Sequence, residues 1–471
     1  MMVRRHTALL LSIVSLTTLI LPCLAFSSSS ALHNDLSSSS FCAQADTLQV
    51  HQIPQSDKLL TSARGWMEHI EQTDGPKYGV GAYTVLRCDA TAVSSSPEDE
   101  LKCEWKIWGE EFHMDRLSSS FQTLHTNLFG VTEDSDGVGS FYGGGITSMS
   151  GMGSSVQTQT MFADSIEETR HVMHMLLEQA TKSICHSGTQ TLMVTILWTP
   201  SSSLTRQSST PLVRGHAAFA TSAPQPPPSN NNVDEHESPL PHLPAPITAC
   251  LAIPNQLTPE ALSVLPRRHS MNLNLQRQVG SSASAKVSSW CRIRRPLEDP
   301  NRYKPSDGSV GEVILVRQPE TERGTNIMTY PNDNFIETLE LLEGLISNLF
   351  VVYQDGSVRT APVGLVLPGY ARHLILQELN ERGMKVDSSK PPTIQDMRDG
   401  LWSEVFVTSA IRLVVPVERI VVPAATGAGA APHVLWEAPN DEYRATKMIQ
   451  SAMYQRGCSL ATVKHIVTTS T

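Results

Sequence analysis

The chain has 471 residues, enough for two ordinary domains and further segments outside a folded core. Charged residues make up 17%, below the roughly 25% typical of soluble domains, because long stretches are rich in uncharged Ser and Pro. The formal net charge is −10 and no basic stripe is present, which argues against nucleic acid as a partner. The eight cysteines show no CxxC spacing, and we interpret them as free thiols in a reducing compartment.

Residues 1–25 have the features of a signal peptide. Two arginines precede an apolar run over residues 8–24, which ends in the small-residue motif CLA. The run is short for a membrane span and contains Pro, so we expect no membrane segment in the mature protein. Residues 26–45 are Ser-rich, and the two segments together resemble the bipartite presequences of algae whose plastids lie inside the endomembrane system. We therefore predict a plastid location, with secretion as the alternative.

Residues 46–221 are predicted to form a small N-terminal α/β domain with a flexible Gly/Ser-rich insert over residues 130–160. The expected elements are a strand after a Gly-rich turn (75–90), a partner strand (103–108), a helix with one apolar face (110–124), a second helix (166–184) and a buried strand (191–198). His171 and His174 lie on the second helix without an acidic partner at a metal-binding spacing. We therefore interpret them as surface residues and predict no metal site.

Residues 222–245 are Pro-rich and cannot form a core, so we predict a disordered loop there. A large C-terminal domain is expected over residues 246–471, with an inserted loop over residues 318–335. Its expected elements are a strand (311–317), a strand–turn–strand–loop–helix segment (343–372, with the helix over 371–382), a run of strands (404–422) and a final helix (441–455). Strand-rich halves with interspersed helices predict a two-domain α+β fold and not a doubly wound sheet.

The most informative segment runs from Glu343 to Arg372, with the sequence EGLISNLFVVYQDGSVRTAPVGLVLPGYAR. A carboxylate stands at one end, and at the other a Pro-Gly loop opens a helix, whose N-terminus can bind a phosphate. The segment resembles the signature of the class IV aminotransferases. These fold-type IV enzymes use pyridoxal 5′-phosphate (PLP) and include branched-chain and D-amino-acid aminotransferases and aminodeoxychorismate lyase. The stretch AKVSSWCRIRRPLE is similar to a little-characterised plant and algal branch of the family.

The resemblance implies a D-amino-acid-aminotransferase-like fold with PLP as cofactor. PLP chemistry needs a lysine that forms a Schiff base and moves a proton, an acid beside the pyridine nitrogen, and donors for the phosphate. By its place in the signature, Glu343 would be the partner of the pyridine nitrogen. The residues implied for phosphate binding are Gly369, Tyr370 and Ala371 at the helix start, and Thr408 with Ser409 after a later strand.

Arg116 lies in the motif FHMDRL, which is similar to the H-x-x-R-L motif at the start of a helix in the family's small domain. The resemblance implies that Arg116 binds the cofactor phosphate through two parallel hydrogen bonds. The alternative is an exposed arginine on an amphipathic helix.

Lys286 fits the family's catalytic lysine, which precedes a helix and then the strand that leads to the signature glutamate. It lies 57 residues before Glu343, a long separation that the predicted insert over residues 318–335 would explain. Lys304 is nearer to Glu343, but it precedes Pro305 and leaves no room for a helix before the next strand. A third possibility is that no lysine serves and catalysis has been lost.

The sequence therefore predicts a PLP-dependent transferase that moves an amino group between an amino acid and a 2-oxo acid, both small molecules. By resemblance alone, a homodimer is expected. One alternative is carbon–carbon lyase chemistry on aminodeoxychorismate with the same lysine. The other is a non-catalytic homologue that keeps the fold as a binding or structural protein.

Overall fold

The computed structural model describes most of the predicted globular chain. The described residues are 36–45, 49–57, 59–92, 101–129, 162–184, 189–201, 210–220, 243–253, 285–298, 310–317, 336, 338–422 and 433–468. The predicted signal peptide (1–25) and the predicted inserts over residues 130–160 and 318–335 lie outside the described residues, as does most of the predicted loop over residues 222–245.

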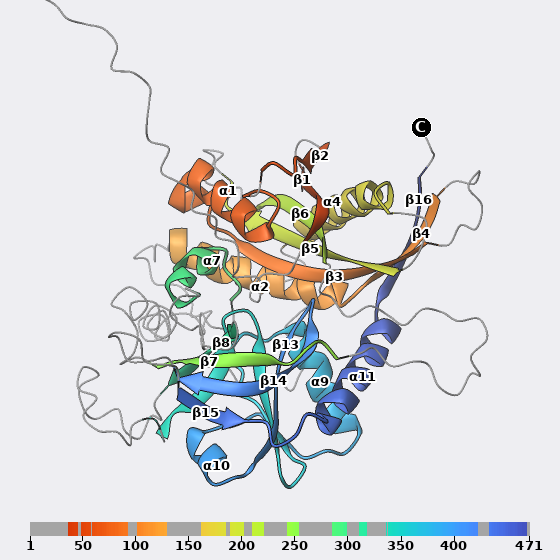
Figure 1. The fold of residues 1–471 in the computed structure, drawn as a ribbon. Coiled ribbons are helices and arrows are strands. Elements are labelled where there is room, and N and C mark those ends of the chain that lie inside the picture. Colours follow the sequence, from red (N-terminus) through yellow and green to blue (C-terminus); the bar gives the residue numbers. More distant parts are fainter. Residues whose placement is uncertain are drawn as a thin grey trace, which may run out of the picture.

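The upper half of the molecule in Figure 1 is built on a seven-stranded antiparallel sheet, sheet A, with strand order β16-β4-β3-β5-β6-β1-β2. Its strands are β1 (Leu36–Gln44), β2 (Gln49–Ile53), β3 (Ala82–Ala92), β4 (Leu101–Ile107), β5 (Thr189–Thr199), β6 (Leu212–Ala220) and β16 (Thr462–Thr468). The register pairs Ala82 with Trp198 and Tyr83 with Leu197 in the centre of the sheet. Because side chains alternate along a strand, these two pairs face opposite sides.

Helices cover both faces of sheet A. Helices α2 (Glu110–Phe129) and α4 (Ala163–Thr181) share a buried apolar cluster with Ala82 and Trp198 on one face. Helix α1 (Ala63–Tyr78) packs on the opposite face, where Tyr83 and Leu197 contact its apolar side chains. Figure 1 shows α1 and α2 on either side of β3. On this side of the sheet, Met193 of β5 packs with Ile411 of the other half of the molecule.

The lower half is a mixed sheet, sheet B, that closes into a barrel. Its strand order is β12-β11-β10-β13-β14-β7-β8-β9, and β15 also pairs with β14. A further pairing between β9 and β10, Glu343 with Asn348, closes the ring of six strands. The strands are β7 (Ile247–Ala252), β8 (Val310–Arg317), β9 (Glu340–Gly344), β10 (Asn348–Tyr353), β11 (Val358–Arg359), β12 (Val386–Asp387), β13 (Trp402–Ser409), β14 (Leu413–Val422) and β15 (His433–Glu437).

Alternation along β10 shows how the barrel is packed. Leu349 and Val351 belong to an apolar cluster that takes alternate residues from all six ring strands and fills the barrel interior. Phe350 and Val352 face outward against helices α9 (Tyr370–Glu381) and α11 (Arg444–Ser459). The remaining elements are the helices α7 (Ser289–Ile293) and α10 (Ile394–Arg398) and the short 3-10 helix η3 (Arg295–Leu297).

The predicted two-domain α+β fold is confirmed, and two strands lie across the predicted domain boundaries. Strand β1 lies inside the segment predicted as a presequence (26–45) and pairs with β6 and β2. The Ser-rich sequence of β1 does not show the apolar alternation of a strand, although Phe41 and Ala43 pack in the core of sheet A. Strand β16, at the end of the predicted C-terminal domain (246–471), joins sheet A beside β4.

The segment predicted as a Gly-rich turn followed by a strand (75–90) differs at its start, because residues 75–78 belong to α1 and the strand begins at Ala82. His171 and His174 are exposed on α4, in agreement with their interpretation as surface residues. In the described parts of the chain, no group of His, Cys, Asp and Glu could hold a metal ion. No helix among these residues combines the length and the apolar character that a membrane span requires.

Candidate active site

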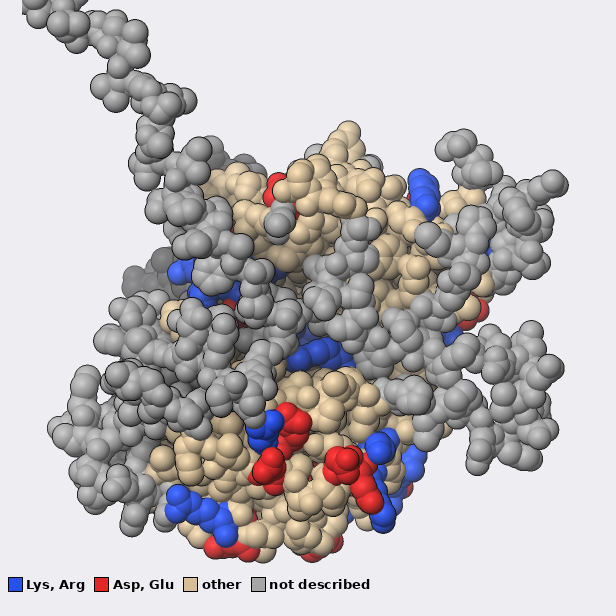
Figure 2. Space-filling model, in the orientation of Figure 1, with Lys and Arg blue, Asp and Glu red and all other residues tan. Residues whose placement is uncertain are grey.

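A cavity lies between sheet A and the barrel. The residues that line it come from the start of α1, from β3 and α2, from the segment before and within α7, from the β9–β10 turn, from the start of α9 and from the β13–β14 turn. Figure 2 shows basic side chains at the waist between the two halves of the molecule. All eight site residues predicted from the sequence line this cavity: Arg116, Lys286, Glu343, Gly369, Tyr370, Ala371, Thr408 and Ser409.

Lys286 is held in place by a short pairing with the start of β3. Its carbonyl accepts a hydrogen bond from the Tyr83 amide at 2.9 Å, and Val287 forms an antiparallel bridge with Ala82. The Lys286 amide donates to Ser120 Oγ of α2 at 3.1 Å. The backbone of Lys286 is therefore fixed to two elements of the N-terminal half, and its Nζ lies 5.0 Å from the centre of the Tyr83 ring.

The surroundings of Lys286 favour the neutral amine. Burial, together with the nearby positive charges of Arg116 and Arg294, lowers the pKa of Lys286 well below its ordinary value. The Glu343 carboxylate is close enough to act in the opposite direction, but its effect is smaller. Only a neutral amine can act as a nucleophile or accept a proton. The lowered pKa therefore favours the form of Lys286 that can do either.

Glu343 stands at the end of β9, where the pairing with Asn348 closes the barrel. Its Oε2 accepts a hydrogen bond from the Leu367 amide at 2.9 Å. Asn348 Nδ2 donates to the Leu367 carbonyl at 2.8 Å, so both residues hold the Pro-Gly loop. The loop backbone passes close to Asn348 at Gly369, because a Cβ added at this glycine would lie 2.3 Å from Asn348 Oδ1. The signature therefore folds into one unit around the cavity.

The start of α9 presents backbone donors to this cavity. Gly369 is the N-cap residue, and no side chain caps the helix there. Tyr370 and Ala371 are its first helical residues and also line the cavity. The first amides of a helix have no partner within the helix, and the helix dipole favours an anion beside them.

Arg116 lies on α2 and reaches both halves of the molecule. Its Nη2 donates to Thr84 Oγ1 at 2.8 Å, and its Nη1 contacts the Pro368 carbonyl at 3.5 Å. Burial lowers the pKa of Arg116 to about 10. His113 lies one turn earlier, and burial, with the charges of Arg116 and Lys286, lowers the pKa of His113 well below its ordinary range. A neutral His113 can accept a hydrogen bond at Nδ1 from the Thr84 hydroxyl, 2.7 Å away.

Two polar atoms of the cavity residues indicate that an anion fits there. Arg116 Nε and Thr408 Oγ1 are buried and have no hydrogen-bond partner among the described residues. Ser409 differs from Thr408, because its Oγ accepts the Arg412 amide at 3.2 Å. A buried donor without a hydrogen-bond partner lowers the stability of the fold, unless a ligand accepts a hydrogen bond from it. A phosphate held by Arg116, Thr408 and the start of α9 would do so.

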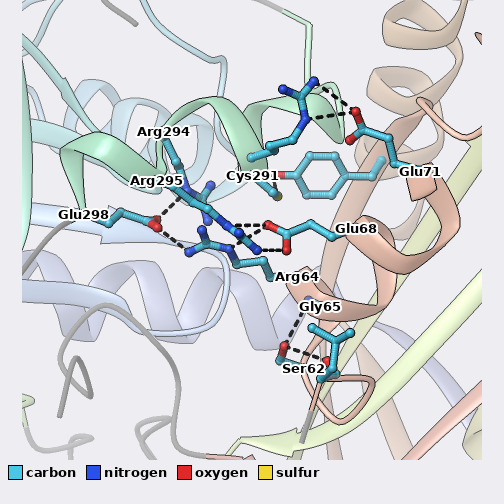
Figure 3. Close-up of polar contacts among 12 residues, drawn as sticks. Ser62, Arg64, Gly65, Glu68, Glu71, Cys291, Arg294, Arg295 and Glu298 are labelled. Atoms are coloured by element: carbon cyan, nitrogen blue, oxygen red, sulfur yellow. Dashed lines mark hydrogen bonds and ion pairs between the residues drawn. The ribbon is translucent and has the colours of Figure 1, made fainter. Parts of the chain in front are cut away.

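Several charged residues of the cavity were not predicted from the sequence. Arg64 and Arg294 line it and belong to an ion-pair network between α1 and the α7–η3 segment (Figure 3). The network joins Arg64, Arg292, Arg294 and Arg295 to Glu68, Glu71 and Glu298. Helix α1 was not predicted, so its charges had no place in the sequence argument. The rival lysine, Lys304, lies outside the described residues.

A lysine, a carboxylate and a helix start without a side-chain cap line one cavity, and these are the groups that PLP chemistry requires. Residues 309–420 match the family model described as amino-transferase class IV. This match confirms the predicted resemblance of the signature segment to the class IV aminotransferases, and with it the predicted class of PLP-dependent transferase. The plant and algal branch stays a prediction. No curated protein matches the chain.

Several solved structures are similar to the chain at low identity. One is a putative branched-chain amino acid aminotransferase from Thermotoga maritima, with 13% identity, a TM-score of 0.42 and coverage of 89% of this chain and 97% of the other. Another is a PLP-bound hypothetical aminotransferase from Mycobacterium tuberculosis, with 12% identity, a TM-score of 0.44 and coverage of 89% and 99%. A fold IV-transaminase from Curtobacterium pusillum has 13% identity, a TM-score of 0.44 and coverage of 88% and 98%.

Proposed function

We propose that the protein is a PLP-dependent aminotransferase that moves an amino group between an amino acid and a 2-oxo acid, with Lys286 as its catalytic lysine. One observation carries the proposal: Lys286, Glu343 and Arg116 line the same cavity although they are far apart in the sequence. The family match over residues 309–420 includes Glu343 but neither of the other two.

PLP, when bound, supplies an electrophilic aldehyde and a ring that withdraws electrons from the substrate. Lys286 is the nucleophile of the site, because its lowered pKa leaves the amine neutral over more of the pH range. The same amine then accepts and returns the proton of the substrate Cα. Its fixed backbone keeps Nζ over the Tyr83 ring, within the cavity.

Glu343 and Arg116 hold the two ends of the cofactor. Glu343 is buried and would accept a hydrogen bond from the protonated pyridine nitrogen. Arg116 would bind the phosphate, with the amides at the start of α9 and the Thr408 hydroxyl.

The test is the visible absorbance of protein incubated with PLP. A lysine-bound cofactor absorbs at about 410–430 nm, and we expect this band in protein lacking residues 1–35, which keeps β1. Lys286→Ala should abolish the band. Lys304→Ala is the matched control and should keep it. A wild-type protein that takes up no PLP would refute the enzymatic function. A band lost only in Lys304→Ala would show that Lys304, and not Lys286, is the catalytic lysine. An amino-donor screen with pyruvate as acceptor then separates transaminase from lyase.

We further propose that the mature protein is plastid-located and homodimeric. The signal-peptide features of residues 1–25 support the first point, and the family resemblance supports the second. Because β1 begins at Leu36, we expect processing to end before that residue. N-terminal sequencing of the native protein should give a start between residues 26 and 36, and light scattering should give twice the chain mass. A start beyond residue 36 or a monomer would contradict these proposals.

A further inference from the structure

The side chains around the cavity are unbalanced in charge. Five basic residues line it, namely Arg64, Arg116, Lys286, Arg294 and Arg412, against the single carboxylate of Glu343. The proposed function uses Arg116, Lys286 and Glu343. Three arginines are left, and an amino acid or 2-oxo acid brings a carboxylate that needs a cation.

Two of these arginines already have strong carboxylate partners. Arg294 Nε contacts Glu298 Oε1 at 2.7 Å. Arg64 Nε contacts Glu68 Oε1 at 3.1 Å, and its Nη1 pairs with Glu298. Figure 3 shows Arg64 and Arg294 directed at the same carboxylate of Glu298. Both guanidinium groups are therefore engaged in the network between α1 and α7.

Arg412 has a weaker partner. Its Nη2 lies 3.4 Å from Glu312 Oε2, the longest of these ion pairs. Glu312 is fully buried in β8, and its two oxygens already accept hydrogen bonds from the amides of Val313 and Leu345 and from Ser347 Oγ. Glu312 thus orients Arg412 through Nη2, and the other N–H groups of the guanidinium can donate to a ligand in the cavity.

The turn that carries Arg412 is fixed from the other half of the molecule. Residues 410–412 connect β13 to β14, and the turn ends at Leu413, whose φ of 58° lies in the left-handed region. Arg87 of β3 donates from Nη1 to the Ile411 carbonyl at 2.9 Å. Arg87 is itself held by Asp89 at 2.9 Å. Arg87 and Glu312 are therefore positioning residues on either side of Arg412.

We propose that Arg412 binds the carboxylate of the amino acid or 2-oxo acid substrate. The proposal rests on the proposed function, because it assigns the substrate contact of the same cavity. A planar guanidinium matches a carboxylate through two parallel hydrogen bonds. The turn between β13 and β14 places this group on the same cavity as Lys286 and Glu343. The site therefore selects amines that carry a carboxylate over simple primary amines.

The test uses PLP-free protein, with inorganic phosphate at saturation to fill the Arg116 site. Isothermal titration calorimetry measures the Kd of 2-oxobutyrate and of its neutral amide. Arg412→Met should raise the Kd of 2-oxobutyrate by about 10- to 100-fold, the effect expected for a hydrogen bond to a charged group. The Kd of the amide should stay the same. Arg412→Lys keeps the charge without the planar fork and should give a smaller loss, which covers the case that Arg412→Met does not fold.

The matched control is Arg382→Met, which removes an exposed arginine at the C-cap of α9 that pairs with Glu378. It should leave both Kd values unchanged. Wild-type affinity in Arg412→Met and Arg412→Lys would overturn the proposal, as would a wild-type protein that binds no 2-oxobutyrate. A loss seen with Arg64→Met but not with Arg412→Met would move the site to α1. PLP absorbance is measured separately, so a colourless protein that still binds 2-oxobutyrate through Arg412 refutes the proposed function alone.

Discussion

Replacing Arg116 by Met is expected to weaken PLP binding without weakening the fold. Arg116 contacts Thr84, His113 and the Pro368 carbonyl, and its Nε has no partner among the described residues. Its pKa is lowered to about 10 by burial, so the protein bears a cost for keeping this charge inside. A residue that is costly to bury and incompletely paired is expected to be retained for a ligand.

The magnitudes follow from these contacts. Hydrogen bonds to charged groups contribute about 1.5–3 kcal/mol each. Arg116 would offer Nε and part of Nη1 to a phosphate, so we expect a loss of about 3 kcal/mol, or about 100-fold in the Kd of PLP. In the PLP-free protein the free energy of unfolding should stay the same or rise by about 1 kcal/mol, because Met removes a buried charge. Thr84 keeps a partner in His113.

Two assays on the same samples check this expectation. Fluorescence or absorbance titration gives the Kd of PLP, and urea unfolding of the PLP-free protein gives the free energy of unfolding. Arg382→Met is the control, because that arginine lies outside the cavity. An unchanged Kd of PLP combined with a loss of more than about 2 kcal/mol in stability would show that Arg116 serves the fold and would refute the reasoning.

Three further changes have defined outcomes. Thr408→Val removes a buried hydroxyl that has no partner among the described residues. The PLP-free protein should therefore be no less stable in urea, and the Kd of PLP should rise about 5- to 10-fold. A clear loss of stability would contradict this expectation. Gly369→Ala brings a Cβ to 2.3 Å from Asn348 Oδ1 and should cost about 1–3 kcal/mol in the same assay; wild-type stability would show that the loop can shift. In Arg116→Met, the loss of a positive charge should raise the pKa of Lys286. As the pH is lowered, the acylation rate of Lys286 should therefore begin to fall at a higher pH in the variant than in the wild type. An unshifted pH profile would exclude this coupling.

The signature could be predicted from the sequence because its parts are consecutive. Glu343 and Gly369 belong to one strand–turn–strand–loop–helix segment, and local patterning sets the order of those elements. That order also sets the site, since Glu343 pairs with Asn348 and bonds to the loop that precedes Gly369. Lys286 was found through its place relative to this segment, and the structure brings it to the same cavity.

The residues that the sequence did not indicate depend on contacts between distant segments. Arg412 gains its setting from Glu312, 100 residues earlier, and from Arg87 in the other half. Helix α1 was missed because Gly65 and Gly75 interrupt its pattern, and Gly75 has a non-helical conformation inside it. Strand β16 follows α11 directly but joins sheet A, and an apolar pattern does not state which sheet a strand will enter.

The central claim is that Lys286 is the lysine to which PLP binds. Reduction of the PLP-loaded protein with borohydride fixes the cofactor to its lysine, and peptide mass spectrometry then identifies the modified residue. We predict a single modified peptide that contains Lys286. Modification of Lys304 or of any other lysine in its place, or the absence of a modified peptide, would contradict the account.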